Sequence, residues 1–488
     1  MPRIPFGPWT PDEPPLDGTG LVTATNVSPQ SSATGYYRSW PALTPISNAL
    51  SGAPLGGVAG KSNDGKAMSF AGDMTKLYRL QASTWGDVSR VGGYSTATPE
   101  VWRFVPYGYD IIATNYSDAI QKFTIGTSTK FADMSATAPR ARHLAVVRDF
   151  LVTGNTSDTD GQRALRVRWS PLGNPSGDWT PNATLQTDFQ DLTTGDEIMG
   201  LVGGEYGAII CRSAIYRMTF VGPPLAFQFD EVVRNHGCAA SGSLATDGTM
   251  SVFYAEDGFY IFNGVALTPI GVGKINRWFE DNVAPSSFPT MSAQIDATRQ
   301  LYVLLFTSKD SPNGQPDTLL QYNWVSDRWT IIRQPALVLV RLLSTVFTLE
   351  DLDTVSMNLD VLPASLDSRL WSGGVPYLGA FTQDLKFSAF AGPALVAEIE
   401  TGEAALGGGV KARVQTVRPL CDGEASVVVK HRDDQWGPQQ ETTAETPTRA
   451  GDCKFNVDAR FHSMKLTIGG PWTVAQGVDF TFVPTSET

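Results

Sequence analysis

A polar turn followed by an apolar run recurs along the first two-thirds of the chain. Six such units occur, and their apolar runs begin near residues 67, 111, 150, 208, 251 and 301. The spacing of roughly 40 to 58 residues is close to the length of one four-stranded propeller blade, about 40–50 residues. The units are NDGKAMSFA (63–71), YGYDIIAT (107–114), VRDFLVTG (147–154), GEYGAIIC (204–211), DGTMSVFYA (247–255) and ATRQLYVLLF (297–306).

Each apolar run has further strand-like segments on both sides. An aromatic-rich segment follows it, such as LRVRW (165–169), and another candidate strand precedes it, such as VWRFV (101–105). Period-2 alternation with β-branched and aromatic residues favours strands over helices. A third segment usually carries an aromatic residue: Trp85, Phe131, Trp179, Phe227 with Phe229, and Trp329; the fifth unit has Leu267 and Ile270 there. The one helical pattern before residue 330 is GKINRWFEDN (273–282).

These patterns predict an all-β protein: a six-bladed β-propeller-like domain with a C-terminal β-sandwich. Blades stacked in a ring bury each other's faces and leave only short edges. A β-sandwich array is the competing interpretation, although sandwiches rarely repeat one four-strand unit six times. The expected parts are an extended N-terminal arm (1–50), propeller repeats (51–336), a ring-closing segment with an acidic loop (337–391) and a small sandwich of alternating strands (392–488).

Composition narrows the class of protein. The chain has 37 Lys and Arg against 49 Asp and Glu, which gives a formal net charge of −12. With 42% hydrophobic and only 18% charged residues it can bury a sizeable core, so it is neither disordered nor a coiled coil. An ordinary DNA-binding factor needs excess positive charge and is disfavoured. The 47 glycines and 32 prolines suit many short strands joined by turns.

No targeting or membrane-spanning segment is expected. The N-terminus, MPRIPFGPWTPDEPP, lacks the charged-then-apolar pattern of a signal peptide. Apolar runs such as 336–340 are far too short to cross a bilayer. The four cysteines form no CxxC pair, and we expect a protein made in a reducing compartment without disulfides.

The search for catalytic and metal-binding patterns predicts no enzyme, no cofactor and no metal. The four histidines form no HExxH or HxH motif. HRDD (431–434) imitates a kinase catalytic loop but lacks the following Asn. NTSDTDG (155–161) is similar to a calcium loop, but its first ligand is not acidic and Val167 stands where the closing Glu belongs.

Two features each allow two interpretations. The repeated Trp and Tyr residues either form a sugar-stacking surface or pack between blades, and their periodicity favours packing. The acidic excess is either a solvated surface or the lining of a channel for a polyanion.

The order of several short motifs resembles the tail hub, nozzle or packaged-DNA-stabilisation proteins of short-tailed bacteriophages. No single motif is specific, so no functional residue is carried over. The stretches that carry the resemblance are VWRFVPYGYDIIATNYSDAIQKF (101–123), APRARHLAVVRDFLVTGN (138–155), AEDGFYIFNGVALTPIGVGKINRWF (255–279), LLQYNWVSDRWT (319–330), ALVAEIETGEAAL (394–406) and ARFHSMKLTIGGPWTVAQGVDF (459–480).

The resemblance implies a structural, non-enzymatic protein of the virion tail, assembled in the host cytoplasm. Six copies would form a homo-hexameric ring below the portal and adaptor complex, extend the DNA channel, and retain the packaged genome until ejection. The ring would also offer attachment surfaces for tail fibres, spikes or a needle. Genomic double-stranded DNA would pass through the lumen without sequence readout. An acidic or neutral lining would let it slide, because a Lys- and Arg-rich lining gains counterion-release energy and holds DNA.

Closure of such a channel needs a gate, and two loops are candidates. One is SKDSPNGQPD (308–317), with Asp310 and Asp317, and the other is the acidic stretch 348–360, with Glu350, Asp351 and Asp353. An ordinary surface loop is the alternative for either one. For the whole protein, the alternatives are a receptor- or glycan-binding tail propeller and a cytoplasmic propeller scaffold.

Overall fold

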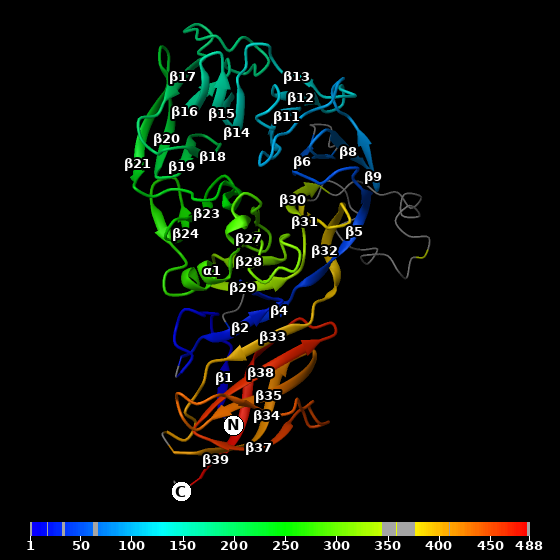
Figure 1. Ribbon diagram of the computed structural model, residues 1–488, viewed down its shortest axis with the longest axis vertical. Helices are drawn as coiled ribbons and strands as arrows, with labels where there is room; N and C mark the ends of the chain where they lie inside the picture. Colours follow the sequence, from blue (N-terminus) through cyan, green and yellow to red (C-terminus); the bar gives the residue numbers. More distant parts are fainter. Residues whose placement is uncertain are drawn as a thin grey trace.

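The computed structural model describes residues 2–16, 18–31, 35–61, 67–343, 358, 376–408 and 410–485. These residues form a ring of four-stranded sheets, with a β-sandwich at one side of the ring (Figure 1). The predicted all-β propeller with a C-terminal sandwich is therefore confirmed. Within the described part of the chain, no helix is long and apolar enough to cross a membrane.

The first three blades follow one another along the chain as antiparallel meanders. Blade 1 contains β6 (Gly56–Lys61), β7 (Ala67–Gly72), β8 (Leu77–Gln81) and β9 (Thr84–Asp87). Blade 2 contains β10 (Arg103–Tyr107), β11 (Asp110–Thr114), β12 (Gln121–Thr124) and β13 (Ala132–Asp133). Blade 3 contains β14 (Arg140–Val147), β15 (Phe150–Asp158), β16 (Gly161–Trp169) and β17 (Asp188–Asp191).

Blades 4 to 6 continue the same order. Blade 4 contains β18 (Ile198–Val202), β19 (Gly207–Cys211), β20 (Ala214–Gly222) and β21 (Ala226–Arg234). Blade 5 contains β22 (Ala245–Thr246), β23 (Ser251–Ala255), β24 (Gly258–Phe262) and β25 (Leu267–Pro269), and blade 6 contains β26 (Ser292–Asp296), β27 (Leu301–Phe306), β28 (Thr318–Asn323) and β29 (Arg328–Arg333). The short helices are η1 (Ser241–Ser243), α1 (Asn276–Asn282), where a helix was predicted, and η2 (Pro285–Ser287).

The blade count is seven, not the predicted six. The additional blade contains β30 (Val338–Leu343), β31 (Pro376–Phe381), β32 (Lys386–Ala394) and β5 (Pro41–Ala49), in that order. Its fourth strand comes from the N-terminal segment and pairs with β32, for example Leu43 opposite Phe390. Because these four strands are not contiguous in the chain, they leave no unit of 40–50 residues for a repeat search to find.

The blades pack through apolar clusters at every junction of the ring. Alternation along a first strand, such as RARHLAVV in β14, buries every second residue, whereas the second strand LYVLLF in β27 is buried on both faces. The first strands of adjacent blades contact each other around the axis, as β30, β6, β10 and β14 do. Seven clusters of buried residues occur in the described chain, and each spans one blade junction. The cluster at the junction of blades 5 and 6 also extends into the sandwich.

The C-terminal domain is a sandwich of two sheets. One contains β3 (Val27–Pro29), β4 (Tyr37–Ser39), β39 (Ala475–Pro484), β34 (Ala412–Cys421) and β37 (Cys453–Ala459), with β1 (Arg3–Pro5) also paired to β39. The other contains β33 (Ala397–Thr401), β38 (Phe461–Gly469), β35 (Glu424–Arg432) and β36 (Gln440–Glu441). The facing sides of the two sheets are apolar and form one core.

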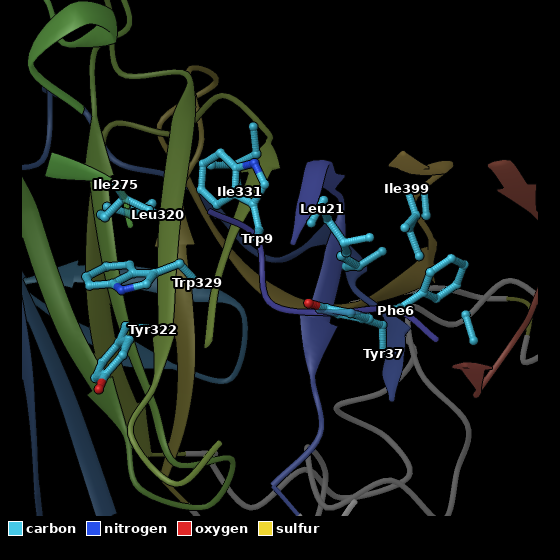
Figure 2. Packing of buried hydrophobic residues seen from close by; sticks show 14 of the residues in the cluster. Phe6, Trp9, Leu21, Tyr37, Ile275, Leu320, Tyr322, Trp329, Ile331 and Ile399 are labelled. Atoms are coloured by element: carbon cyan, nitrogen blue, oxygen red, sulfur yellow. The ribbon is translucent and has the colours of Figure 1, made fainter. Parts of the chain in front are cut away.

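The second sheet of the sandwich is continuous with blade 6. Strand β2 (Leu21–Thr25) pairs in parallel with β29 on one side and antiparallel with β33 on the other. One hydrophobic cluster runs across this seam, from Trp329 and Tyr322 in blade 6 through Trp9 and Leu21 to Ile399 in the sandwich (Figure 2). The N-terminal 50 residues therefore contribute strands both to blade 7 and to the sandwich.

Candidate axial site

The predicted gate loop connects β27 and β28 and is closed at its base by Asp317. The Asp317 carboxylate accepts hydrogen bonds from the Ser308 backbone N–H at 2.9 Å and from Ser308 Oγ at 2.7 Å. Asp310 is exposed near the tip of the loop. Asp317 thus shapes the loop, and Asp310 faces solvent. Glu350, Asp351 and Asp353, in the second predicted gate, lie outside the described residues.

A cavity of about 510 Å³ lies at the centre of the ring. First strands of blades 1, 2, 5, 6 and 7 and the loops before them line it, and two residues of the predicted gate loop, Gln315 and Pro316, also reach it. Its walls are mostly apolar, with Leu244, Met291 and Leu339 among them. The lining also includes two residues of opposite charge, Arg103 and Glu100.

Arg103, the first residue of β10, crosses from its own blade to the far side of the axis. Its Nη2 donates to Ser241 Oγ at 2.7 Å, and that hydroxyl donates to the carbonyl of Met199 at 2.6 Å. The side chain therefore links blade 2 to η1, which precedes blade 5, and to blade 4. The accessible part of the side chain faces the cavity, and burial within the ring lowers the pKa of Arg103 from its ordinary value.

A group of ionised side chains from blades 2, 3 and 4 lies near Arg103. Arg142 in β14 donates from Nη2 to Glu100 at 2.8 Å and from Nη1 to Glu197 at 2.6 Å. Arg212 reaches the other oxygen of Glu197 at 3.4 Å. We name these residues the axial cluster: Glu100, Arg103, Arg142, Glu197 and Arg212.

The axial cluster carries three positive and two negative charges. Its excess positive charge falls on Arg103, which makes no ion pair within the described residues. His143 is buried close to Arg103 and Arg142. Burial lowers the pKa of His143 well below its ordinary value, so the His143 side chain is neutral at pH 7. An arrangement of this kind can attract a single negative charge to the axis.

The repeated aromatic residues are packed between blades, as the favoured interpretation predicted. Trp179 and Trp329 are fully buried, and Trp85, Phe131 and Phe227 are at most 8% exposed. Trp169 and Phe150, for example, both pack edge-to-face on Phe227 at the junction of blades 3 and 4. These residues therefore do not form a sugar-stacking surface.

The loop that is similar to a calcium site lies in the β15–β16 hairpin, where arginines bind its carboxylates. Arg166 Nη1 donates to Asp160 at 2.8 Å, and Arg168 Nη1 donates to Asp158 at 3.0 Å. Arg166 also holds Asp191 through Nε at 2.7 Å. No group of three or more metal-ligating side chains occurs in the part of the chain that the structure describes.

The motif search missed the axial site. Arg103 stood inside a predicted strand, VWRFV, as one polar residue among apolar ones. Its partner Ser241 lies 138 positions further along the chain. The one available signal was a charged residue in the first strand of a blade, where the side chain has to face either a neighbouring blade or the axis.

Comparisons with known proteins return propeller structures at low similarity. The WD40 domain of Pan2 from Neurospora crassa is 8% identical, with a TM-score of 0.35, over 59% of this chain and 82% of that one. The N-terminal domain of Nup159 is 10% identical, with a TM-score of 0.37, over 75% of this chain and 98% of that one. No protein-family model matches the chain, and no curated protein sequence matches it. The propeller assignment rests on the sheet order given above.

Proposed function

We propose that this chain is a non-enzymatic structural protein of a short-tailed phage tail, a hub or nozzle. Six copies form a ring below the portal and adaptor complex and carry fibres, spikes or a needle on their outer surface. The resemblance in the order of motifs supports this proposal. The segments 101–123, 255–279 and 319–330 that carry it fall in blades 2, 5 and 6.

The observation that carries the proposal is the continuous sheet from blade 6 into the sandwich. Asn26 joins the parts at this seam: its Oδ1 accepts from the Arg333 backbone N–H at 2.9 Å, and its Nδ2 donates to the Val396 carbonyl at 2.8 Å. A shared sheet and a shared core resist hinge motion between the two parts. A stiff unit of this kind suits a ring subunit that transmits load between an adaptor and attached fibres.

In this proposal the DNA conduit lies between copies, not along the propeller axis. Arg103 crosses the axis, and a cavity of about 510 Å³ is too small for a duplex, whose major groove alone is about 12 Å wide. The net charge of −12 per copy suits a channel that DNA passes through without being held.

The alternative is a receptor- or glycan-binding tail propeller. One observation favours it: Trp436, in the loop between β35 and β36, is 93% exposed. An exposed indole at a loop tip can anchor a partner or stack on a sugar ring. The repeated aromatic residues of the blades offer no support to this alternative, because they are buried.

Sedimentation of the full chain with the portal and adaptor proteins of the same phage separates the two functions. The hub proposal predicts a complex with six copies of the chain per adaptor ring. Failure to join the adaptor, together with binding to host cells that Trp436→Ala abolishes, would overturn it in favour of receptor binding.

A further inference from the structure

We propose that the axial cavity is a binding site for an organic monoanion, a carboxylate attached to an apolar body. The site is formed by Arg103 and the apolar walls around it. This inference goes beyond the hub function and does not depend on it, because the cavity lies within one propeller and needs no second copy.

The first step is the uncompensated charge of Arg103. A charge held inside a protein without a counter-charge is costly, so such groups are normally paired. The charge of Glu100 acts on Arg103, but this carboxylate already receives two hydrogen bonds from Arg142, at 3.1 and 2.8 Å. The thiol of Cys238 stays neutral, because burial raises the pKa of Cys238 to about 11. Among the residues that the structure describes, no carboxylate therefore forms an ion pair with Arg103.

The second step is the geometry of the guanidinium. Its Nη2 donates one hydrogen bond to Ser241 Oγ, which fixes the side chain across the axis. A guanidinium has five N–H donors in a planar fork, and this fork matches the two oxygens of a carboxylate. Because Ser241 is held in turn by the Met199 carbonyl, the Arg103 side chain is fixed where it lines the cavity.

The third step is the character of the walls. Leu244, Met291, Leu337, Leu339 and Val340 line the cavity and suit an apolar body. Its volume of about 510 Å³ lies within the range of small-molecule sites, about 300–1,000 Å³. Two charged residues, Arg103 and Glu100, also line it, and the Glu100 carboxylate is already held by Arg142. A mostly apolar lining with a few polar groups that fix orientation is the usual composition of such a site.

The charge and the walls together exclude other ligand classes. A cation is repelled by Arg103, and the one carboxylate in the lining, Glu100, is already paired with Arg142. A polyanion such as a nucleotide brings more negative charge than the single excess positive charge can balance. A neutral apolar molecule packs against the apolar walls but leaves the guanidinium of Arg103 without an anionic partner. Only a monoanion with an apolar body satisfies both parts.

The test measures calorimetric binding of three ligands with the same chain length to the full protein: octanoate, octan-1-ol and octylamine. We expect octanoate to bind at least tenfold more tightly than octan-1-ol, and octylamine to bind more weakly than both. Arg103→Gln should weaken octanoate binding at least tenfold and leave octan-1-ol binding unchanged. The matched control is Arg148→Gln, which removes an arginine paired with Glu205 at the other end of β14 and should bind octanoate like the unmodified protein.

Equal binding of octanoate and octan-1-ol, or no binding of octanoate, would overturn the proposal. So would a folded Arg103→Gln protein that binds octanoate as tightly as the unmodified one. If Arg103→Gln does not fold, Arg103→Lys decides, since it keeps the charge but loses the planar fork. Arg103→Lys should bind octanoate more weakly than the unmodified protein but still prefer octanoate to octan-1-ol. Octanoate binding as tight as that of the unmodified protein, or no preference for octanoate over octan-1-ol, would contradict the site.

Discussion

The junctions between blades and the axis of the propeller differ in chemistry. At the junctions, aromatic and aliphatic side chains pack together, as Trp329 of blade 6 does with Phe259 of blade 5 at a ring-centre distance of 5.1 Å. At the axis, Arg103 and Glu100 line a cavity instead, and Arg142 joins Glu100 to Glu197. Apolar burial holds the ring together, and the charged axis is left free to take a ligand.

Removing an aromatic side chain from a junction should have the largest effect. Trp329→Ala deletes a fully buried indole that also donates from Nε1 to the Ile270 carbonyl at 3.1 Å. We expect the free energy of unfolding to fall by about 3–5 kcal/mol in urea denaturation followed by circular dichroism.

The matched control is Trp436→Ala, in which the indole is 93% exposed. It should change the free energy of unfolding by no more than about 0.5 kcal/mol. Similar losses for the two variants would mean that packing at the junctions does not hold the ring.

Placing a charge in an apolar core should have the next largest effect. Both ring nitrogens of His462, in the sandwich core, are buried without a hydrogen-bond partner. Burial, with a smaller effect of His431, lowers the pKa of His462 from 6.5 to about 4. Between these values the unfolded chain binds a proton and the folded chain does not, so stability falls as the pH falls. The loss from this residue should reach about 2 kcal/mol at pH 5 and about 3 kcal/mol near pH 4.

The variant that tests this is His462→Leu, measured against the unmodified protein from pH 7 to pH 4. The variant should not be destabilised at pH 7. As the pH falls, the free energy of unfolding of the unmodified protein should decrease more than that of His462→Leu. A difference that stays constant with pH would refute the assignment. His143 at the axis contributes a dependence of the same sign to both proteins.

The seam between propeller and sandwich should show an intermediate effect. Asn26 has a φ of 59°, which glycine and asparagine tolerate best, and its side chain makes two hydrogen bonds across the seam. Asn26→Ala should cost about 2 kcal/mol, from lost hydrogen bonds and backbone strain. Asn26→Gly relieves the strain and should cost about half as much. Equal costs in urea denaturation would mean that the conformation of this residue is unimportant.

The smallest effect is expected at the axis. Glu197 and its arginine partners are 28–39% exposed at their side chains, so the ion pairs are partly screened by solvent. Glu197→Gln should cost about 1 kcal/mol or less, and Glu205→Gln, with a side chain 74% exposed, should cost nothing measurable. If Glu197→Gln lowered the free energy of unfolding as much as Trp329→Ala does, the axis would stabilise the ring as strongly as the blade junctions, which contradicts the comparison.

The sequence pattern was enough to predict six blades and a ring-closing segment at 337–391, but not that this segment forms a seventh blade with a strand from the N-terminal region. All six apolar runs fall on the second strand of a blade, β7, β11, β15, β19, β23 and β27, because local alternation and turn residues determine a meander. The seventh blade depends on β5 pairing with β32, more than 300 residues apart, and no local pattern records that contact. Arg103 was missed for the same reason, since its partner Ser241 belongs to another blade.

The most direct test of the hub account is electron microscopy of the full chain, negatively stained, alone and with the portal and adaptor proteins of the same phage. The account predicts six-fold rings below the adaptor, each subunit showing a propeller rigidly joined to its sandwich. Three-fold particles, or single molecules that stay separate even when the adaptor is present, would contradict it.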